Sequence, residues 1–296
     1  MKLSISRLLL TLFVLCLALS LPLGTAEAAA GVKASGSCGD GVEWSLGADG
    51  TLTVSGNGAM EDYQGANTDI YPPYALAPWA YEQAGITAVV IGDGVTSIGR
   101  HAFGNCENLK RVSIPGSVAS IGNCAFEGCD GLTEVKIPDG VVSIGSSAFG
   151  YCHSLTGVRI ADSVTFIGVA AFTNCENLKR VSIPGGVTAI EQLTFDACRK
   201  LTGVGIPDSV ISIGTSAFNR CGSLTDVYYG GSEEQWSRIE IDDYYDGNAE
   251  LREAVVHYNS AFSGGVPAAV LIAAAVAVAL VIALVVVRKK GKTALL

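Results

Sequence analysis

Apolar residues recur with a period of 23 positions through the middle of the chain, between residues 86 and 223. Within each row the first, fourth and sixth positions are apolar, as at Leu132, Val135 and Ile137. The spacing of two between the fourth and sixth positions predicts a short strand with one buried face. Six rows follow without a gap, and they begin at Ile86, Leu109, Leu132, Leu155, Leu178 and Leu201, with a partial seventh from Leu224.

The second half of each row carries another apolar pair, such as Val141 and Ile144, and then an Ala-Phe pair, such as Ala148-Phe149. The Phe ring is expected to point inward from a short helical or irregular turn. One row cannot bury its own apolar face, whereas stacked rows can, with neighbouring strands about 4.8 Å apart. The pattern therefore predicts a mostly β solenoid with a parallel strand stack along one side.

The row consensus, IPDGVTSIGxxAFxxC, resembles the BspA-type leucine-rich repeats of bacterial and protist surface proteins, over six rows and about half of the chain. A period of about 20–29 residues is typical of leucine-rich repeats. The resemblance implies a leucine-rich-repeat solenoid on a cell surface. It also implies attachment to matrix proteins, to other cells or to surface glycans.

Both flanks of the repeats are expected to form caps, because an end row would otherwise expose its core to water. In the first flank, 29–85, alternating polar and apolar residues around Gly-Asp turns predict a small β-rich module. In the second, 224–258, Ser232 and Gln235 have the spacing of a capping box, which predicts a short helix within an α/β module. The six repeats occupy 86–223 between these caps.

The two ends of the chain indicate export and a membrane anchor. Residues 1–28 have the basic start, apolar centre and small-residue exit of a signal peptide. After a linker at 259–265, residues 266–287 form 22 consecutive residues without a charge, enough for a helix to span a bilayer. The basic tail, 288–296, is expected to stay in the cytoplasm. The sequence thus predicts a single-pass cell-membrane protein with its N-terminal bulk outside.

The exported region is acidic, with 13 basic and 27 acidic residues once the signal peptide and tail are set aside. A net charge of −14 excludes nucleic acid as a partner. Against this background, six of the twelve outward second, third and fifth positions in rows two to five are basic and one is acidic. They predict a basic stripe made of Lys110, Arg111, Lys136, Arg159, Lys179 and Arg180.

Part of this stripe is an exact internal repeat, because NCENLKRVSIPG occurs at 105–116 and again at 174–185. The repeat places two Lys-Arg pairs on one face, three strands or about 14 Å apart. Such a stripe favours an anionic glycan or an acidic extracellular or envelope protein as partner. The alternative is that Lys and Arg only keep exposed strands soluble.

The cysteines form a second column. Six of the eight beyond residue 28 recur at one position of the row: Cys106, Cys129, Cys152, Cys175, Cys198 and Cys221. Inward side chains in one column favour buried free thiols over a disulfide ladder. Ligands on a straight column cannot surround zinc, so no metal site is predicted. Cys38 and Cys124 lie outside the column, and a bond between them stays an open alternative.

Catalytic chemistry finds little support in the sequence. Among the three histidines, His101 and His153 occupy positions that accept any residue type in other rows, which indicates surface residues. The acidic loop with Asp242, Asp246 and Glu250 lacks calcium-loop spacing and is interpreted as solvated. No catalytic residue, cofactor or metal is predicted.

The resulting hypothesis is a membrane-anchored cell-surface binding protein, adhesin or receptor-like, and not an enzyme. The alternatives are a structural envelope scaffold or spacer without a specific ligand, or an enzyme hidden in 31–85.

Overall fold

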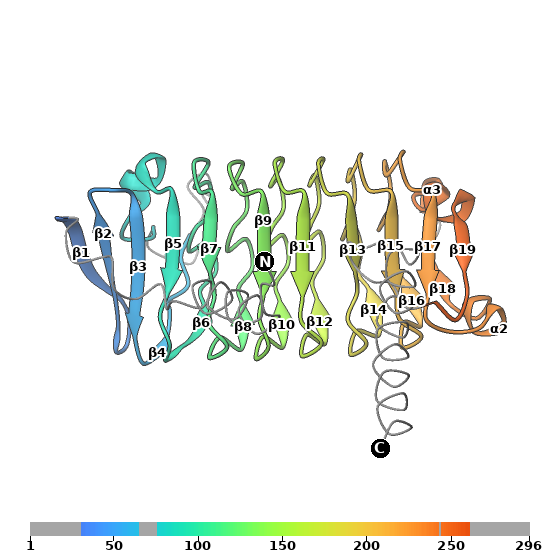
Figure 1. Cartoon of the computed structure of the whole chain (residues 1–296), viewed down its shortest axis with the longest axis horizontal. Coiled ribbons are helices and arrows are strands. Elements are labelled where there is room, and N and C mark those ends of the chain that lie inside the picture. Colours follow the sequence, from blue (N-terminus) through green and yellow to red (C-terminus); the bar gives the residue numbers. More distant parts are fainter. Residues whose placement is uncertain (1–30, 65–75, 243, 261–296) are drawn as a thin grey trace, which may run out of the picture.

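The 23-residue rows form the coils of an elongated solenoid, in which consecutive strands lie side by side along the long axis (Figure 1). The computed structural model describes residues 31–64, 76–242 and 244–260. Paired strands of consecutive coils are offset by 23 residues, because Val135 lies opposite Val158 and Val181 opposite Val204. The predicted stack of parallel strands is therefore confirmed.

The longer strands line one side of the solenoid, in two sheets that follow each other along the axis. The first sheet contains, in spatial order, β1 (Val32–Gly39), β2 (Val42–Gly47), β3 (Thr51–Gly56), β5 (Ala88–Ile91) and β7 (Arg111–Ser113). The second contains β9 (Glu134–Ile137), β11 (Gly157–Ile160), β13 (Arg180–Ser182), β15 (Gly203–Ile206), β17 (Asp226–Tyr229) and β19 (Val255–His257).

Shorter strands form a second side of each coil and pair in parallel, and between successive repeats they keep the 23-residue offset, as Ile121 does with Ile144. One sheet contains β4 (Gly58–Ala59), β6 (Val95–Ile98), β8 (Ser120–Ile121), β10 (Ser143–Ile144) and β12 (Phe166–Ile167). The other contains β14 (Ala189–Ile190), β16 (Ser212–Ile213) and β18 (Glu240–Ile241).

The third side of the coil is a turn that carries the Phe column into the core. Phe149 is fully buried, and its ring centroid lies 5.3 Å from that of Phe126 and 5.5 Å from that of Phe172. The stack of parallel rings runs the length of the repeats: Trp79, Phe103, Phe126, Phe149, Phe172, Phe195 and Phe218. The predicted inward ring is confirmed.

The cysteine column lies beside these rings and is also buried. In five coils the thiol donates a hydrogen bond to the backbone oxygen of Phe in the preceding coil, as Cys152 Sγ does to Phe126 O at 3.2 Å. Burial raises the pKa of the Cys152 thiol to about 12. Cys38 and Cys124 are free thiols as well, with no bond between them.

The N-terminal cap extends the first sheet instead of lying beside it. Strands β1, β2 and β3 pair antiparallel, and β3 then pairs in parallel with β5 of the first coil. Trp79, just before the 3-10 helix η1 (Ala80–Gly85), donates from Nε1 to Ala102 O at 2.8 Å. In the next coil the backbone N of Phe103 donates to Ala125 O at 2.8 Å. The indole therefore supplies the donor that a further coil would have provided.

The C-terminal cap satisfies the other end of the stack in a similar way. It contains the 3-10 helix η2 (Tyr244–Asp246) and the helix α3 (Ala249–Glu253). Asn248 is fully buried, and its Oδ1 accepts from the backbone N of Phe218 at 3.1 Å. Its Nδ2 donates to Gly214 O at 3.1 Å. This side chain replaces a backbone acceptor that the next coil would have offered.

The predicted capping box is confirmed at the start of α2 (Glu233–Trp236), where Ser232 and Gln235 bond to each other's backbone N–H. The first residues of the predicted linker 259–265 differ from expectation. The backbone N of Asn259 donates to Gly231 O at 2.8 Å, and that of Ser260 donates to Tyr229 O at 3.0 Å. These two residues therefore belong to the cap, because its backbone holds them.

The predicted signal peptide (1–28), the rest of the linker, the span at 266–287 and the tail at 288–296 lie outside the described residues. Among the residues that the structure describes, no helix has the length and hydropathy of a membrane span.

Candidate ligand-binding face

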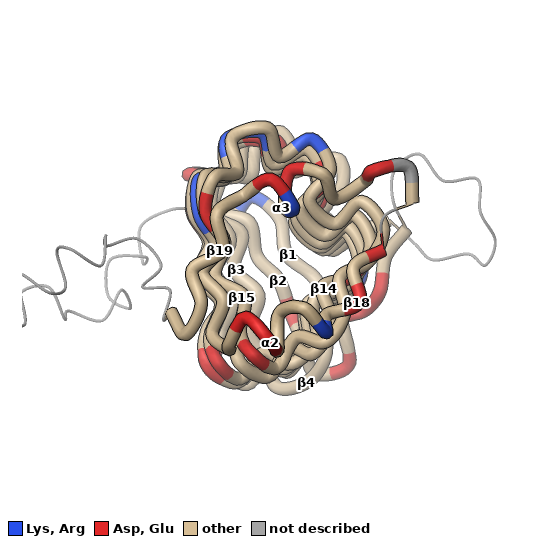
Figure 2. The backbone as a smooth tube through the Cα atoms, turned by 90° about the vertical axis from the view of Figure 1, so that its right-hand side faces the viewer, with Lys and Arg blue, Asp and Glu red and all other residues tan. Residues whose placement is uncertain are grey.

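The six predicted basic residues all lie on the outer face of the long-strand sheets, between β7 and β13. We call these six residues the basic face. Alternation along β7, β9, β11 and β13 places Arg111, Lys136, Arg159 and Arg180 outward, and parallel pairing then brings equivalent residues together. Lys136 on β9, for example, lies directly opposite Arg159 on β11. Lys110 and Lys179 are exposed and lie directly before β7 and β13. Viewed along the axis, most Lys and Arg segments gather on the long-strand side at upper left, and Asp and Glu lie mainly along the lower and right-hand edges (Figure 2).

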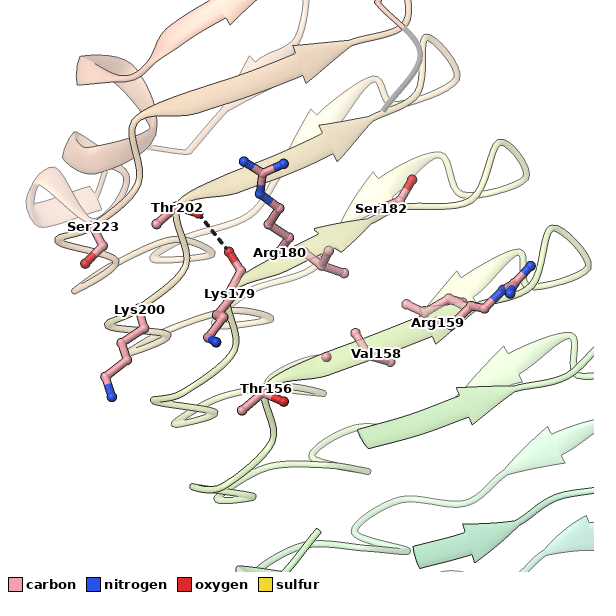
Figure 3. Close-up of a pocket in the computed structure, with 12 residues that line it drawn as sticks. Thr156, Val158, Arg159, Lys179, Arg180, Ser182, Lys200, Thr202 and Ser223 are labelled. Atoms are coloured by element: carbon pink, nitrogen blue, oxygen red, sulfur yellow. Dashed lines mark hydrogen bonds between the residues drawn. The ribbon is translucent and has the colours of Figure 1, made fainter. Parts of the chain in front are cut away.

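Two grooves cross this face. The larger has a volume of about 990 Å³ and is lined by Arg159, Lys179, Arg180 and Lys200, with the hydroxyls of Thr156, Ser182, Thr202 and Ser223 (Figure 3). The smaller, of about 590 Å³, is lined by Lys110, Arg111, Lys136 and Arg159, with Glu134 as its acidic residue. Arg159 lines both grooves, so the two form one continuous surface. Neither Lys200 nor the hydroxyls were predicted as site residues.

Glycines flank Arg180, which is half-buried on the floor of the larger groove. Its partners on the two neighbouring strands are Gly157 and Gly203, so no side chain flanks it at that level of the sheet. A Cβ added at Gly157 would meet no atom within 4 Å, which shows open space above this strand. Threonines fix the backbone just before the strands, since Thr202 Oγ1 donates to Lys179 O at 3.2 Å.

None of the six cations of the basic face makes a salt bridge or a side-chain hydrogen bond in the described part of the chain. Arg111 and Arg180 act on Asp49 and Asp226 only through longer-range charge. Cations elsewhere are engaged. Each of the other cations makes a contact: Lys33 with Glu82, Arg199 with Glu176, Lys200 with Asn177, Arg220 with Asp196 and Arg238 with Glu234, and Arg100 and Arg252 also interact. Unpaired positive charge is thus concentrated on one surface of an acidic region.

An acidic and aromatic cluster borders the face at its C-terminal end. His257 Nε2 lies 2.7 Å from Asp226 Oδ1, and the His257 ring stacks on Tyr228 with centroids 4.8 Å apart. Hydrogen bonds from His257 and Thr225 hold the pKa of Asp226 below its usual value. Asp226 therefore bonds to His257 and Thr225 and makes no salt bridge with Arg180.

The remaining residues considered from the sequence have local roles. His153 Nδ1 lies 2.6 Å from Asp130 Oδ1 on the exposed surface. In the acidic loop, Asp242 accepts from Thr215 Oγ1 at 2.5 Å and from the backbone N of Tyr244 at 3.0 Å. Within the described residues of this loop, no three ligand atoms converge on a point. The loop closes the C-terminal cap.

A coil of 23 residues with a parallel strand on one side and stacked Phe rings inside defines a leucine-rich-repeat solenoid. The sequence matches the BspA type leucine rich repeat region in six copies, over residues 76–202 and 119–240. The chain belongs to this family.

Solved structures with the same repeats share low sequence identity with this chain. The T. pallidum leucine-rich repeat protein is 23% identical over 74% of this chain and 96% of that one, with a TM-score of 0.48. A leucine-rich repeat protein from Bacteroides ovatus is 23% identical over 68% of this chain and 66% of that one, with a TM-score of 0.42. No curated protein sequence matches the chain.

Proposed function

We propose that this protein is a membrane-anchored cell-surface binding protein whose basic face binds an acidic partner, either an anionic glycan or an acidic segment of an extracellular protein. One observation carries the proposal: six cations that make no salt bridge or side-chain hydrogen bond within the described residues line two adjoining grooves, while the region as a whole has a net charge of −14. Clustered unpaired charge raises the local concentration of an oppositely charged ligand and speeds its association.

The alternative explanation by solubility accounts poorly for this placement. Lys residues that prevent unwanted sheet pairing act at strand edges, where backbone N–H and C=O groups are open. The open ends of the long side are β1 and β19, whereas the basic face lies over β7 and β9, where the two sheets meet, and over β11 and β13 inside the second sheet. A scaffold that binds nothing also gains no benefit from leaving six cations unpaired while other cations find partners. Binding, and not catalysis, is the activity that this surface supports.

The membrane anchor is proposed from the sequence, on the 22 uncharged residues at 266–287 and the basic residues that follow them. A chain with this anchor should sediment with cell membranes, and a chain that ends at residue 265 should appear in the medium. Cell fractionation of both chains tests this part of the proposal. A full-length chain found free in the medium would contradict it.

The proposed binding of a polyanion to the basic face predicts an affinity that depends strongly on salt concentration. Heparin and poly-glutamate, as model polyanions, should bind the full-length chain with an affinity that falls as salt displaces them. Release of counterions from a linear polyanion by six cations corresponds to a slope of roughly −4 to −5 in log K against log salt concentration. Fluorescence anisotropy between 50 and 300 mM salt, about the range over which screening changes, measures this slope. Uncharged dextran is the control, and equal binding of dextran and heparin would argue against the proposal.

A further inference from the structure

A second cluster of polar side chains lies away from the basic face, on the turn side of the first two coils. His101 and Cys124 occupy the same position in consecutive coils, and both have a left-handed backbone, with φ of 52° and 54°. Each backbone N–H donates to the next coil, His101 N to Asn123 O and Cys124 N to Ser146 O, both at 2.9 Å. Because stacked coils are about 4.8 Å apart, the two side chains are neighbours.

Glu127 completes the cluster from the same turn as Cys124. Its backbone N donates to Cys124 O at 3.2 Å, which fixes it three residues further along. The imidazole nitrogen, the thiol sulfur and a carboxylate oxygen all lie within 4.8 Å of one another, and all three residues are half-buried. Donor atoms around tetrahedral zinc are about 3.5 Å apart, given bonds of about 2.0–2.3 Å. Small side-chain rotations would bring the three atoms onto one ion.

No other coil of the described repeats combines three such ligands at these positions. The position of His101 and Cys124 is filled elsewhere by Ser147, Ala170, Leu193 and Ser216. The position of Glu127 is filled by Gly104, Gly150, Thr173, Asp196 and Asn219. Asp196 is the only other carboxylate, and it is bound to Arg220 Nη2 at 2.6 Å. The core repeat does not demand His101, Cys124 or Glu127.

We propose that His101, Cys124 and Glu127 bind one zinc ion, with a fourth position open to water or to a ligand from a partner. Nitrogen, sulfur and oxygen together suit a borderline-soft cation and disfavour Mg²⁺ and Ca²⁺, which prefer oxygen ligands alone. The ion would bridge the first two coils next to the N-terminal cap. No metal site was predicted from the sequence, because the cysteine column is straight, the acidic loop lacks calcium-loop spacing and His101 was interpreted as a surface residue.

Zinc binding is expected to release one proton from the site. Burial, with a further contribution from Glu127, raises the pKa of the Cys124 thiol to about 12, so Zn²⁺ must displace the thiol proton and one H⁺ is released. Burial and the neighbouring Arg100 lower the pKa of His101, which leaves its imidazole neutral and able to bind. Glu127 and Arg100 are the charged groups that face both side chains. Zinc affinity should therefore rise with pH.

The test uses the untagged full-length chain and two metals. Calorimetric titration with Zn²⁺ should show one ion per chain. Co²⁺ in the same site should give a thiolate-to-metal charge-transfer band. Cys124→Ala should abolish the band, and His101→Gln and Glu127→Gln should each weaken Zn²⁺ binding by at least about tenfold. Two matched controls, Cys38→Ala and His153→Gln, should keep the band and the affinity.

The variants remain interpretable even where they alter folding, because the melting temperature without metal is measured for each. Zn²⁺ should raise the melting temperature of the natural chain and of the two controls but not that of Cys124→Ala. Zinc binding that is absent, or that survives all three substitutions unchanged, would overturn the proposal. These results are independent of binding at the basic face, because none of the three residues lies on it.

Discussion

Replacing Phe149 by Ala should lower the free energy of unfolding by about 3–5 kcal/mol. The ring is fully buried in the middle of the stack, between Phe126 and Phe172. Its removal leaves a cavity that a rigid coil on each side cannot close. It also removes two stacked ring pairs, each of which contributes about 0.5–1.5 kcal/mol beyond the burial of area. Because each coil contacts only its neighbours, a defect here weakens the coupling of both halves of the solenoid.

A matched control lies two residues away on the same turn. Tyr151 is 45% exposed and has a φ of 59°, a conformation that Asn adopts readily. Asn105 and Asn174 occupy the equivalent position in other coils. Tyr151→Asn should therefore change stability by no more than about 0.5 kcal/mol. Urea unfolding of both variants, followed by circular dichroism, measures the difference. Equal midpoints for the two would mean that the ring stack does not stabilise the solenoid.

The repeats could be predicted from the sequence because their apolar positions recur with a regular period of 23 residues. Strand pairs such as Val135 with Val158 follow directly from it. Caps could be predicted at the two ends of the stack, but the side chains that complete the hydrogen bonds there could not. Trp79 and Asn248 complete a hydrogen-bond ladder only because the neighbouring coil is missing, and both lie in segments outside the period. Their partners are backbone groups, which leave no trace in the sequence.

The basic face, too, could be predicted from the sequence only in part. Outward positions follow from strand alternation, so the six cations could be placed on one surface. Whether a cation is paired depends on side-chain geometry between coils, as when Arg199 reaches Glu176. The role of Gly157 and Gly203 beside Arg180 emerges only from the register of three strands. The cluster of His101, Cys124 and Glu127 combines residues from two different positions of the row, so neither position alone indicated a metal site.

Reversing the charge of Lys110, Arg111, Lys179 and Arg180 to Glu should abolish binding to heparin and poly-glutamate. The melting temperature should stay nearly unchanged, because these side chains are on the surface and form no salt bridge that the change would break. Loss of the two Lys-Arg pairs removes the attraction on both grooves, and four carboxylates then repel the polyanion. Anisotropy titrations and thermal melts of the full-length chain measure the two effects separately.

The decisive comparison is with a variant of equal net charge. Reversal of Lys33, Arg199, Arg238 and Arg252 changes the total charge by the same amount at exposed sites off the basic face. A long-range effect of net charge would weaken binding equally in both variants, whereas a local site is lost only in the first. Gly157→Glu adds a second, independent measure, because its side chain enters open space beside Arg180 without removing a cation. It should weaken binding while the control variant retains it. Equal binding by the two charge-reversed variants would leave the basic face without a ligand and favour the scaffold.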